Sequence, residues 1–266
     1  MNGELIPLTE ADRQRLVEAR QWLESPGLAA RISDKLGSPI EAGMKRLPSG
    51  WREKVNNLTQ TALNQALKAA IRTMKTGESA QPSTRMHKFA VATSGGVGGF
   101  FGLPALALEL PVSTTLILRA IADIARSEGE DLHDTDTQLA CLTVFALGGK
   151  GDADDGAESG YFAVRAALAQ SVTQAAEHLA SRGMTSEGAP VLIRLITSVA
   201  QRFSVQVSQK VAAQAIPAIG AAGGATINTL FMDHYQRMAR GHFTIRALER
   251  QYGQEAVQAA YLALGR

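Results

Sequence analysis

The sequence predicts an all-α protein, a multi-helix bundle with two central Gly/Ala-rich apolar helical segments. Apolar residues recur three or four positions apart along most of the chain, two long segments carry no charge, and no alternation of strand and helix patterns occurs. A chain of 266 residues with 45% apolar content can bury a large core. Leu, Ala, Val and Ile must build most of that core, because only 5% of the residues are aromatic.

Three helices are predicted near the N-terminus. The first covers residues 10–24 behind an N-cap at Thr9, and the second covers residues 27–36. The third begins after Ser49 and ends before Gly77. Its apolar stripe consists of Trp51, Val55, Leu58, Ala62, Ala66, Ala69 and Thr73.

Residues 77–84, GESAQPST, have the composition of a turn or linker. They separate the three N-terminal helices from the rest of the chain. We therefore divide the chain into an N-terminal helical layer, residues 1–80, and a helical domain, residues 81–266, which together form one compact unit.

Two long uncharged segments are the most unusual feature of the chain. Residues 89–108 contain no charged residue over 20 positions, and 22 uncharged residues separate Lys210 from Asp233. Both segments contain glycines four positions apart, a spacing that lets two helix backbones approach closely. The helix-packing or membrane-facing glycines are Gly95, Gly99, Gly102, Gly220 and Gly224.

Two interpretations of these segments remain open. A helix of about 20 residues is about 30 Å long, enough to cross a bilayer core. The segments are nevertheless rich in Gly, Ala, Ser and Thr; they contain Pro104 and Pro217, and Pro111 interrupts the apolar run that continues after Glu109. They are either buried central helices of a bundle or re-entrant or peripheral contacts with a membrane. The small residues suit pairing within one chain or between two, so no oligomeric state is predicted.

Polar residues at the edges of the apolar segments form a candidate site. Glu109 lies between apolar neighbours in LALELP, and burial of its carboxylate is costly without a cation beside it. That cation is either Arg119 or an arginine of another helix. Arg119 also belongs to a helix face of alternating charge, with Asp123, Arg126 and Glu130. The candidate polar site consists of Glu109, Arg119, Asp123, Asp233, His234 and His242.

The only grouped histidines, His234 and His242, are eight positions apart. On a straight helix they would lie about 12 Å from each other, too far to share a metal ion without a bend at Gly241. Structural hydrogen bonding is the simpler role for both, and no metal site is predicted. Cys141, the only cysteine, lies among apolar residues and is expected to be a small core residue in a reducing compartment.

Several classes of function lack support. The formal net charge is +2 with acidic and basic residues interspersed, which disfavours a nucleic-acid partner. The loop over residues 148–160 does not follow the spacing of a calcium loop, and no phosphate-binding motif or nucleophile elbow occurs. No cofactor and no catalytic residue are therefore assigned. The N-terminus lacks a secretory pattern, so we expect a cytoplasmic protein.

Four runs of sequence carry a family resemblance. They are HKFAVATSGGVGGFFGLPALALELPVSTTLILRAIADIARSEGEDL, CLTVFALGG, ESGYFAVRAALA and AIPAIGAAGGATINTLFMDHYQRMARGHFTIRALERQYG. From about His87 to Gly253, in this order, the chain resembles the EcsC family of bacterial proteins, named for a protein encoded beside the two components of an ABC transporter. The resemblance implies an association with transport or the cell envelope. It carries over no activity, ligand or catalytic residue.

Two functions are compatible with these observations. The favoured one is a non-enzymatic helical module at the inner face of the cell membrane, with the membrane surface or a membrane protein as partner. The alternative is a small-molecule-binding protein or hydrolase with the candidate polar site in the bundle core. The alternative requires Glu109 and His234 to converge on one pocket.

Overall fold

One long helix, α10, runs through the molecule, and the other helices pack around it. The computed structural model describes residues 7–37, 40–45, 47, 49–74, 103–148, 160–182, 190–216 and 220–264. Its elements are α1 (Glu10–Leu23), α2 (Leu28–Leu36), α3 (Ile40–Met44), α4 (Trp51–Met74), α6 (Leu103–Ser127), α7 (Thr135–Thr143), the 3-10 helix η1 (Val144–Ala146), α8 (Gly160–Arg182), α9 (Pro190–Gln214), α10 (Gly220–Tyr252) and α11 (Gln254–Ala263). Every element in these ranges is helical, which confirms the predicted class.

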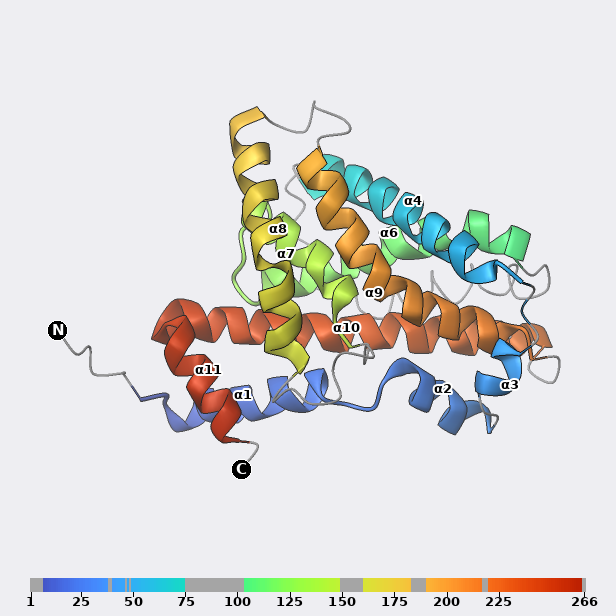
Figure 1. Cartoon of the computed structure of the whole chain (residues 1–266). Coiled ribbons are helices and arrows are strands. Elements are labelled where there is room, and N and C mark those ends of the chain that lie inside the picture. Colours follow the sequence, from blue (N-terminus) through green and yellow to red (C-terminus); the bar gives the residue numbers. More distant parts are fainter. Residues whose placement is uncertain are drawn as a thin grey trace.

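The long helix α10 lies between two groups of helices (Figure 1). α1 and α2 pack along one side of it, and α6, α9 and η1 contact it from the other. α4 covers α6 and α9, α8 packs on α7 and α9, and α11 turns back from the end of α10 toward α1. Helices from both sides of residue 80 thus share one core. The division into residues 1–80 and 81–266 stays a prediction.

The predicted N-terminal helices are confirmed, and their ends follow local rules. The hydroxyl oxygen of Thr9 accepts a hydrogen bond of 3.2 Å from the backbone N–H of Asp12, as an N-cap does. α2 begins at Leu28, one residue later than predicted. α4 begins at Trp51 and buries that side chain together with Val55. α3, a single short turn of helix, was not predicted from the sequence.

The first uncharged segment is described only from Leu103, where α6 begins. The predicted packing glycines Gly95, Gly99 and Gly102 lie outside the described residues. α6 continues through Pro111 without a break. α6 is therefore one continuous helix, and the position of each side chain around its axis decides whether that side chain faces the core or points outward.

The second uncharged segment forms the end of α9 and the beginning of α10. Gly220 is the first residue of α10, and Gly224 is buried one turn further along. The segment is thus divided between two helices. Within the described ranges, no helix is long and apolar enough to cross a membrane.

Two glycines allow helices to approach each other closely. A Cβ atom added to Gly43 would lie 1.9 Å from the carbonyl oxygen of Ala212, so α3 can rest on α9 only if residue 43 has no side chain. A Cβ atom at Gly241 would lie 2.9 Å from the carbonyl oxygen of Ala19 on α1. α10 passes Gly241 as one continuous helix, so no bend there brings His234 and His242 together.

Four aromatic side chains form the centre of the core. The rings of Phe145, Phe203, Phe231 and Tyr235 contact one another, with centroids between 4.8 and 5.9 Å apart. Together they join η1, α9 and α10. Cys141 is 0% exposed, which confirms its prediction as a core residue, and burial raises the pKa of its thiol.

Candidate functional site

Glu109 projects from α6 into the core and pairs with a lysine. Its Oε1 atom lies 2.5 Å from Nζ of Lys210 on α9 and 3.0 Å from Nδ2 of Asn228 on α10. Lys210 is 0% exposed, and its ammonium lies 5.0 Å from the ring centroid of Phe231. The ion pair therefore joins three helices away from water. Either charge left alone in this place would be strongly destabilising.

The prediction that an arginine pairs with Glu109 is wrong. Arg119 is exposed, and it lies about 80° around α6 from Glu109 because the two residues are ten positions apart. Asp123 is half-buried and pairs instead with Arg126 at 3.6 Å. The cation that reaches Glu109 is Lys210, which comes from α9.

Asp233 and His234 are neighbours on α10 but contact different parts of the fold. Asp233 accepts a hydrogen bond of 2.9 Å from Nη2 of Arg31 on α2 and lies 3.5 Å from Nη2 of Arg237. His234 is buried against Gly148, where an added Cβ atom would lie 2.5 Å from its Cε1. Burial, together with the positive charges of Arg31 and Arg237, lowers the pKa of His234 to about 3, so the ring is neutral at pH 7.

His242 occupies a third environment. Its Nδ1 atom lies 2.9 Å from the hydroxyl oxygen of Tyr161 at the start of α8. In the described parts of the chain, no hydrogen bond or ion pair connects Glu109, His234 and His242. The six predicted site residues therefore do not form one pocket. They take part in separate contacts along α6 and α10.

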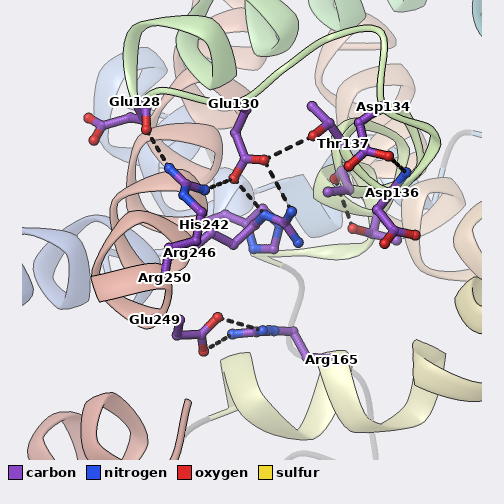
Figure 2. A network of polar contacts seen from close by, with 12 residues as sticks. Glu128, Glu130, Asp134, Asp136, Thr137, Arg165, His242, Arg246, Glu249 and Arg250 are labelled. Atoms are coloured by element: carbon purple, nitrogen blue, oxygen red, sulfur yellow. Dashed lines mark hydrogen bonds and ion pairs between the residues drawn. The ribbon is translucent and has the colours of Figure 1, made fainter. Parts of the chain in front are cut away.

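A network of carboxylates and arginines surrounds the C-terminal half of α10 (Figure 2). Glu130 accepts hydrogen bonds from Nε of Arg246 at 2.8 Å, from the hydroxyl of Thr137 at 2.9 Å, and from Arg250. Burial opposes ionisation of Glu130, but hydrogen bonding to Arg246 and its charge outweigh that cost and hold the pKa of Glu130 below its usual value. Glu130 lies beyond the end of α6 at Ser127, so it does not continue the predicted charged face of that helix.

A second ion pair of this network joins α8 to α10. Nη1 and Nη2 of Arg165 donate to the two carboxylate oxygens of Glu249 at 2.7 and 2.9 Å, a bidentate arrangement. Nη1 of Arg165 also lies 3.3 Å from the hydroxyl oxygen of Tyr161. Tyr161 thus connects this ion pair to His242.

A cavity of about 560 Å³ lies beside this network. α7, α8, the C-terminal half of α10 and α11 contribute to its wall. Of the six predicted site residues, His242 alone contributes to the wall. In this cavity, a residue predicted for a site meets a space that could hold a small molecule.

These polar centres also contain residues that were not predicted from the sequence: Lys210, Asn228, Tyr161, Arg165 and Arg246. A cation that interrupts an apolar helical pattern was a usable signal for Lys210, because a buried carboxylate needs such a partner. The acidic loop residues Asp152, Asp154, Asp155 and Glu158 lie outside the described residues. Elsewhere in the described chain, no group of three or more His, Cys, Asp or Glu is arranged to hold a metal ion.

The fold and these centres define a class of protein: an all-α bundle around one long helix, held by buried ion pairs and carrying a lateral cavity. The chain belongs to the EcsC protein family, whose model matches residues 28–248. The family match begins at residue 28, whereas the first of the four sequence runs that resemble the family begins at His87. The family domain therefore includes α2, α3 and α4. Searches of curated proteins and of solved structures found no match.

Proposed function

We propose that the protein is a non-enzymatic helical module that binds the inner surface of the cell membrane peripherally, beside a transport or envelope system. The observation that carries this proposal is an exposed apolar stripe on α6. Leu108, the last residue of the uncharged segment 89–108, is 79% exposed, and Val112, four positions further on, is 51% exposed. An apolar pair of this exposure next to such a segment favours a contact with lipid over a purely solvated surface.

The orientation of the stripe is set by Glu109, which lies about 80° around the helix axis from the middle of the stripe. Glu109 holds α6 to α9 through Lys210 and to α10 through Asn228, so Leu108 and Val112 cannot turn inward without breaking a buried ion pair. In Figure 1, α6 lies behind α4 and its first turns reach the edge of the molecule. A membrane could therefore approach this end of α6.

An exposed cation lies on the same face. Arg119 is within about 40° of Leu108 and Val112 around the helix axis, and about 16 Å along it from Leu108. A basic residue beside apolar side chains is typical of helices that lie in the membrane interface, where the cation contacts anionic headgroups. Each cation near an anionic surface adds about 1 kcal/mol to binding, which favours the cytoplasmic leaflet.

Vesicle flotation tests this proposal. The purified protein is mixed with vesicles of phosphatidylcholine alone or of phosphatidylcholine with phosphatidylglycerol. We expect it to float with the anionic vesicles. The double change Leu108→Ser with Val112→Ser should lower the affinity for vesicles about tenfold or more, because each apolar side chain buried in lipid contributes about 1.5–3 kcal/mol.

Ile193→Ser is the matched control, because Ile193 is 53% exposed and belongs to another helix, α9. It should leave flotation unchanged, and circular dichroism should show that all variants are folded. A wild-type protein that stays in solution with both vesicle types would contradict lipid binding. Equal losses for Ile193→Ser and the double variant would contradict the assignment to α6.

A further inference from the structure

The cavity beside α10 has the size of a small-molecule site and follows α8 lengthwise. Its volume of about 560 Å³ lies in the range of about 300–1,000 Å³ that such sites occupy. On α8 its lining extends from Phe162 to Glu177, which are 15 positions apart, or about 22 Å along the helix axis. α7, α10 and α11 also contribute lining residues. The cavity can therefore hold an extended molecule that lies along α8.

Small apolar side chains line the cavity along α8. Residues at steps of three and four positions face it, so one side of the helix forms the lining. They are Ala166, Ala169, Val172 and Ala176, which together we call the apolar wall. The space beside this wall is open because an alanine side chain ends at Cβ. A hydrocarbon chain against the wall would lose contact with water, which favours binding.

Two carboxylates that line the cavity have no cation beside them. Asp136 lies in the first turn of α7, and Glu177 lies on α8 just beyond the apolar wall. In the part of the chain that the structure describes, neither side chain pairs with a cation. Both residues are exposed, so only water hydrates their carboxylates in the unliganded protein. Their negative charge is therefore available to a ligand.

The arginines that line the cavity are already paired with other carboxylates. Nη1 and Nη2 of Arg165 donate to the two carboxylate oxygens of Glu249 at 2.7 and 2.9 Å. Nε and Nη2 of Arg246 donate to Glu130 at 2.8 and 3.1 Å. An anionic ligand would thus meet the two carboxylates of the lining without gaining an unpaired cation. The charges around the cavity favour a cationic ligand.

We propose that this cavity binds an amphipathic organic cation, an alkylammonium whose ammonium pairs with Glu177 and whose chain lies along the apolar wall. Glu177 is eight positions from Ala169, or about 12 Å along the helix, a distance that an extended chain of about eight carbons covers. Asp136 adds a second negative charge to the lining. This site is separate from the α6 surface proposed to bind membranes, and either proposal can fail without the other.

Nuclear magnetic resonance titration of the full chain with octylammonium tests the site. We expect a Kd of about 1 mM and shifts of the backbone amides of Ala140, Ala169 and Val172. 1-Octanol, with the same chain and no charge, should bind about fivefold more weakly, because an ion pair at an exposed carboxylate contributes modestly. Octanoate should bind at least tenfold more weakly than octylammonium, because it is repelled. Added sodium chloride should reduce the difference between octylammonium and 1-octanol.

A pair of glutamate variants tests the charge. Glu177→Gln should lower the affinity for octylammonium about threefold to fivefold and leave that for 1-octanol unchanged, because only the ion pair is lost. Glu255→Gln is the matched control, since Glu255 is an exposed residue of α11 that does not line the cavity. Its affinity for both compounds should equal that of the wild type.

A pair of alanine variants tests the apolar wall. Ala169→Trp places a large ring in the cavity and should weaken the binding of octylammonium and 1-octanol about tenfold. Ala167→Trp changes an exposed residue of α8 that does not line the cavity, and should bind both compounds like the wild type. The double change Leu108→Ser with Val112→Ser should also leave octylammonium binding unchanged. Loss of binding in that double variant would place the ligand on α6 and overturn the proposal.

Three further outcomes would overturn the proposal. They are absence of octylammonium binding by the wild type, equal or tighter binding of octanoate or 1-octanol, and octylammonium binding to Glu177→Gln or Ala169→Trp with the affinity of the wild type. All of these substitutions are at exposed positions, and circular dichroism should show that every variant is folded.

Discussion

The two ionic centres on α10 differ in their access to water. Near the beginning of α10, Asn228 joins a pair whose side chains are 0% exposed at Lys210 and 5% exposed at Glu109. Near its end, Glu130 is paired with Arg246 and Arg250, whose side chains are 26% and 44% exposed. The first centre does not line the cavity of about 560 Å³ and serves to hold helices together. The second lies beside a cavity, where polar groups can bind a ligand.

The difference also predicts unequal contributions to stability. Removal of one partner from a fully buried pair leaves a charge without water, whereas a half-exposed arginine that loses its carboxylate is hydrated again. In chemical denaturation, a substitution at the first centre should therefore lower the free energy of unfolding clearly more than a substitution at the second.

The largest effect is expected at Glu109. Glu109→Ala leaves the ammonium of Lys210 buried and unpaired and should lower the free energy of unfolding by about 3–5 kcal/mol. Asp154→Ala and the exposed control Glu255→Ala should each change it by less than about 0.5 kcal/mol. Urea denaturation measures all three. The double change Glu109→Leu with Lys210→Met should recover much of the loss, and equal losses for Glu109→Ala and Glu255→Ala would contradict burial of an ion pair.

Acid should destabilise the part of α10 that holds the histidines. The pKa of His234 is about 3 in the folded chain, whereas the usual pKa of a histidine is 6.5, so the unfolded chain binds the proton first as pH falls. The stability contributed by the neutral ring is present above pH 6.5 and is lost as pH decreases toward 3. Between pH 7 and pH 5 this loss is about 2 kcal/mol for one such histidine.

The variant His234→Gln isolates this contribution. Its stability should fall by about 2 kcal/mol less than that of the wild type between pH 7 and pH 5. Urea denaturation at several pH values gives both curves. Parallel curves for the two proteins would mean that His234 has the same pKa in the folded and unfolded chains.

A smaller effect is expected at the hydrated centre. Glu130→Gln keeps the shape of the side chain but removes the charge shared with Arg246, and should lower the free energy of unfolding by about 1.5 kcal/mol. The loss should become smaller as pH falls below 4.5, the usual pKa of a glutamate, because the unfolded chain then takes up a proton that folded Glu130, with its lowered pKa, resists. A loss as large as that of Glu109→Ala would remove the distinction between the two centres.

The smallest effect is expected at Arg250. Its side chain is 44% exposed, so Arg250→Ala should cost less than about 1 kcal/mol. Salt tests the same point, since added sodium chloride should reduce the difference between Arg250→Ala and the wild type. A difference that does not respond to salt would indicate that this guanidinium is more enclosed than its exposure implies.

Helices were predicted well wherever a local pattern defined them. Thr9 caps α1 by a hydrogen bond within three residues, and the stripe from Trp51 to Ala66 repeats with the period of a single helix. α3 escaped prediction because its five residues are too few to show a period. The burial of Glu109 was also predictable, because its immediate neighbours are apolar.

The candidate site was predicted less well, because side chains far apart in sequence decide it. Lys210 is 101 positions from Glu109, and Tyr161 is 81 positions from His242. No spacing in the sequence distinguishes these partners from Arg119 or from other polar residues. Of the six predicted residues, only His242 contributes to the cavity.

The sequence by itself determined the all-α class, the boundaries of several helices and the burial of Glu109 and Cys141, since helical period and neighbouring apolar residues are local properties. The tertiary structure alone decided which charges pair, that Gly43 lets α3 rest on the backbone of α9, and that His234 and His242 face different surroundings. These features depend on how helices cross one another. Crossing is set by the packing of whole helix faces.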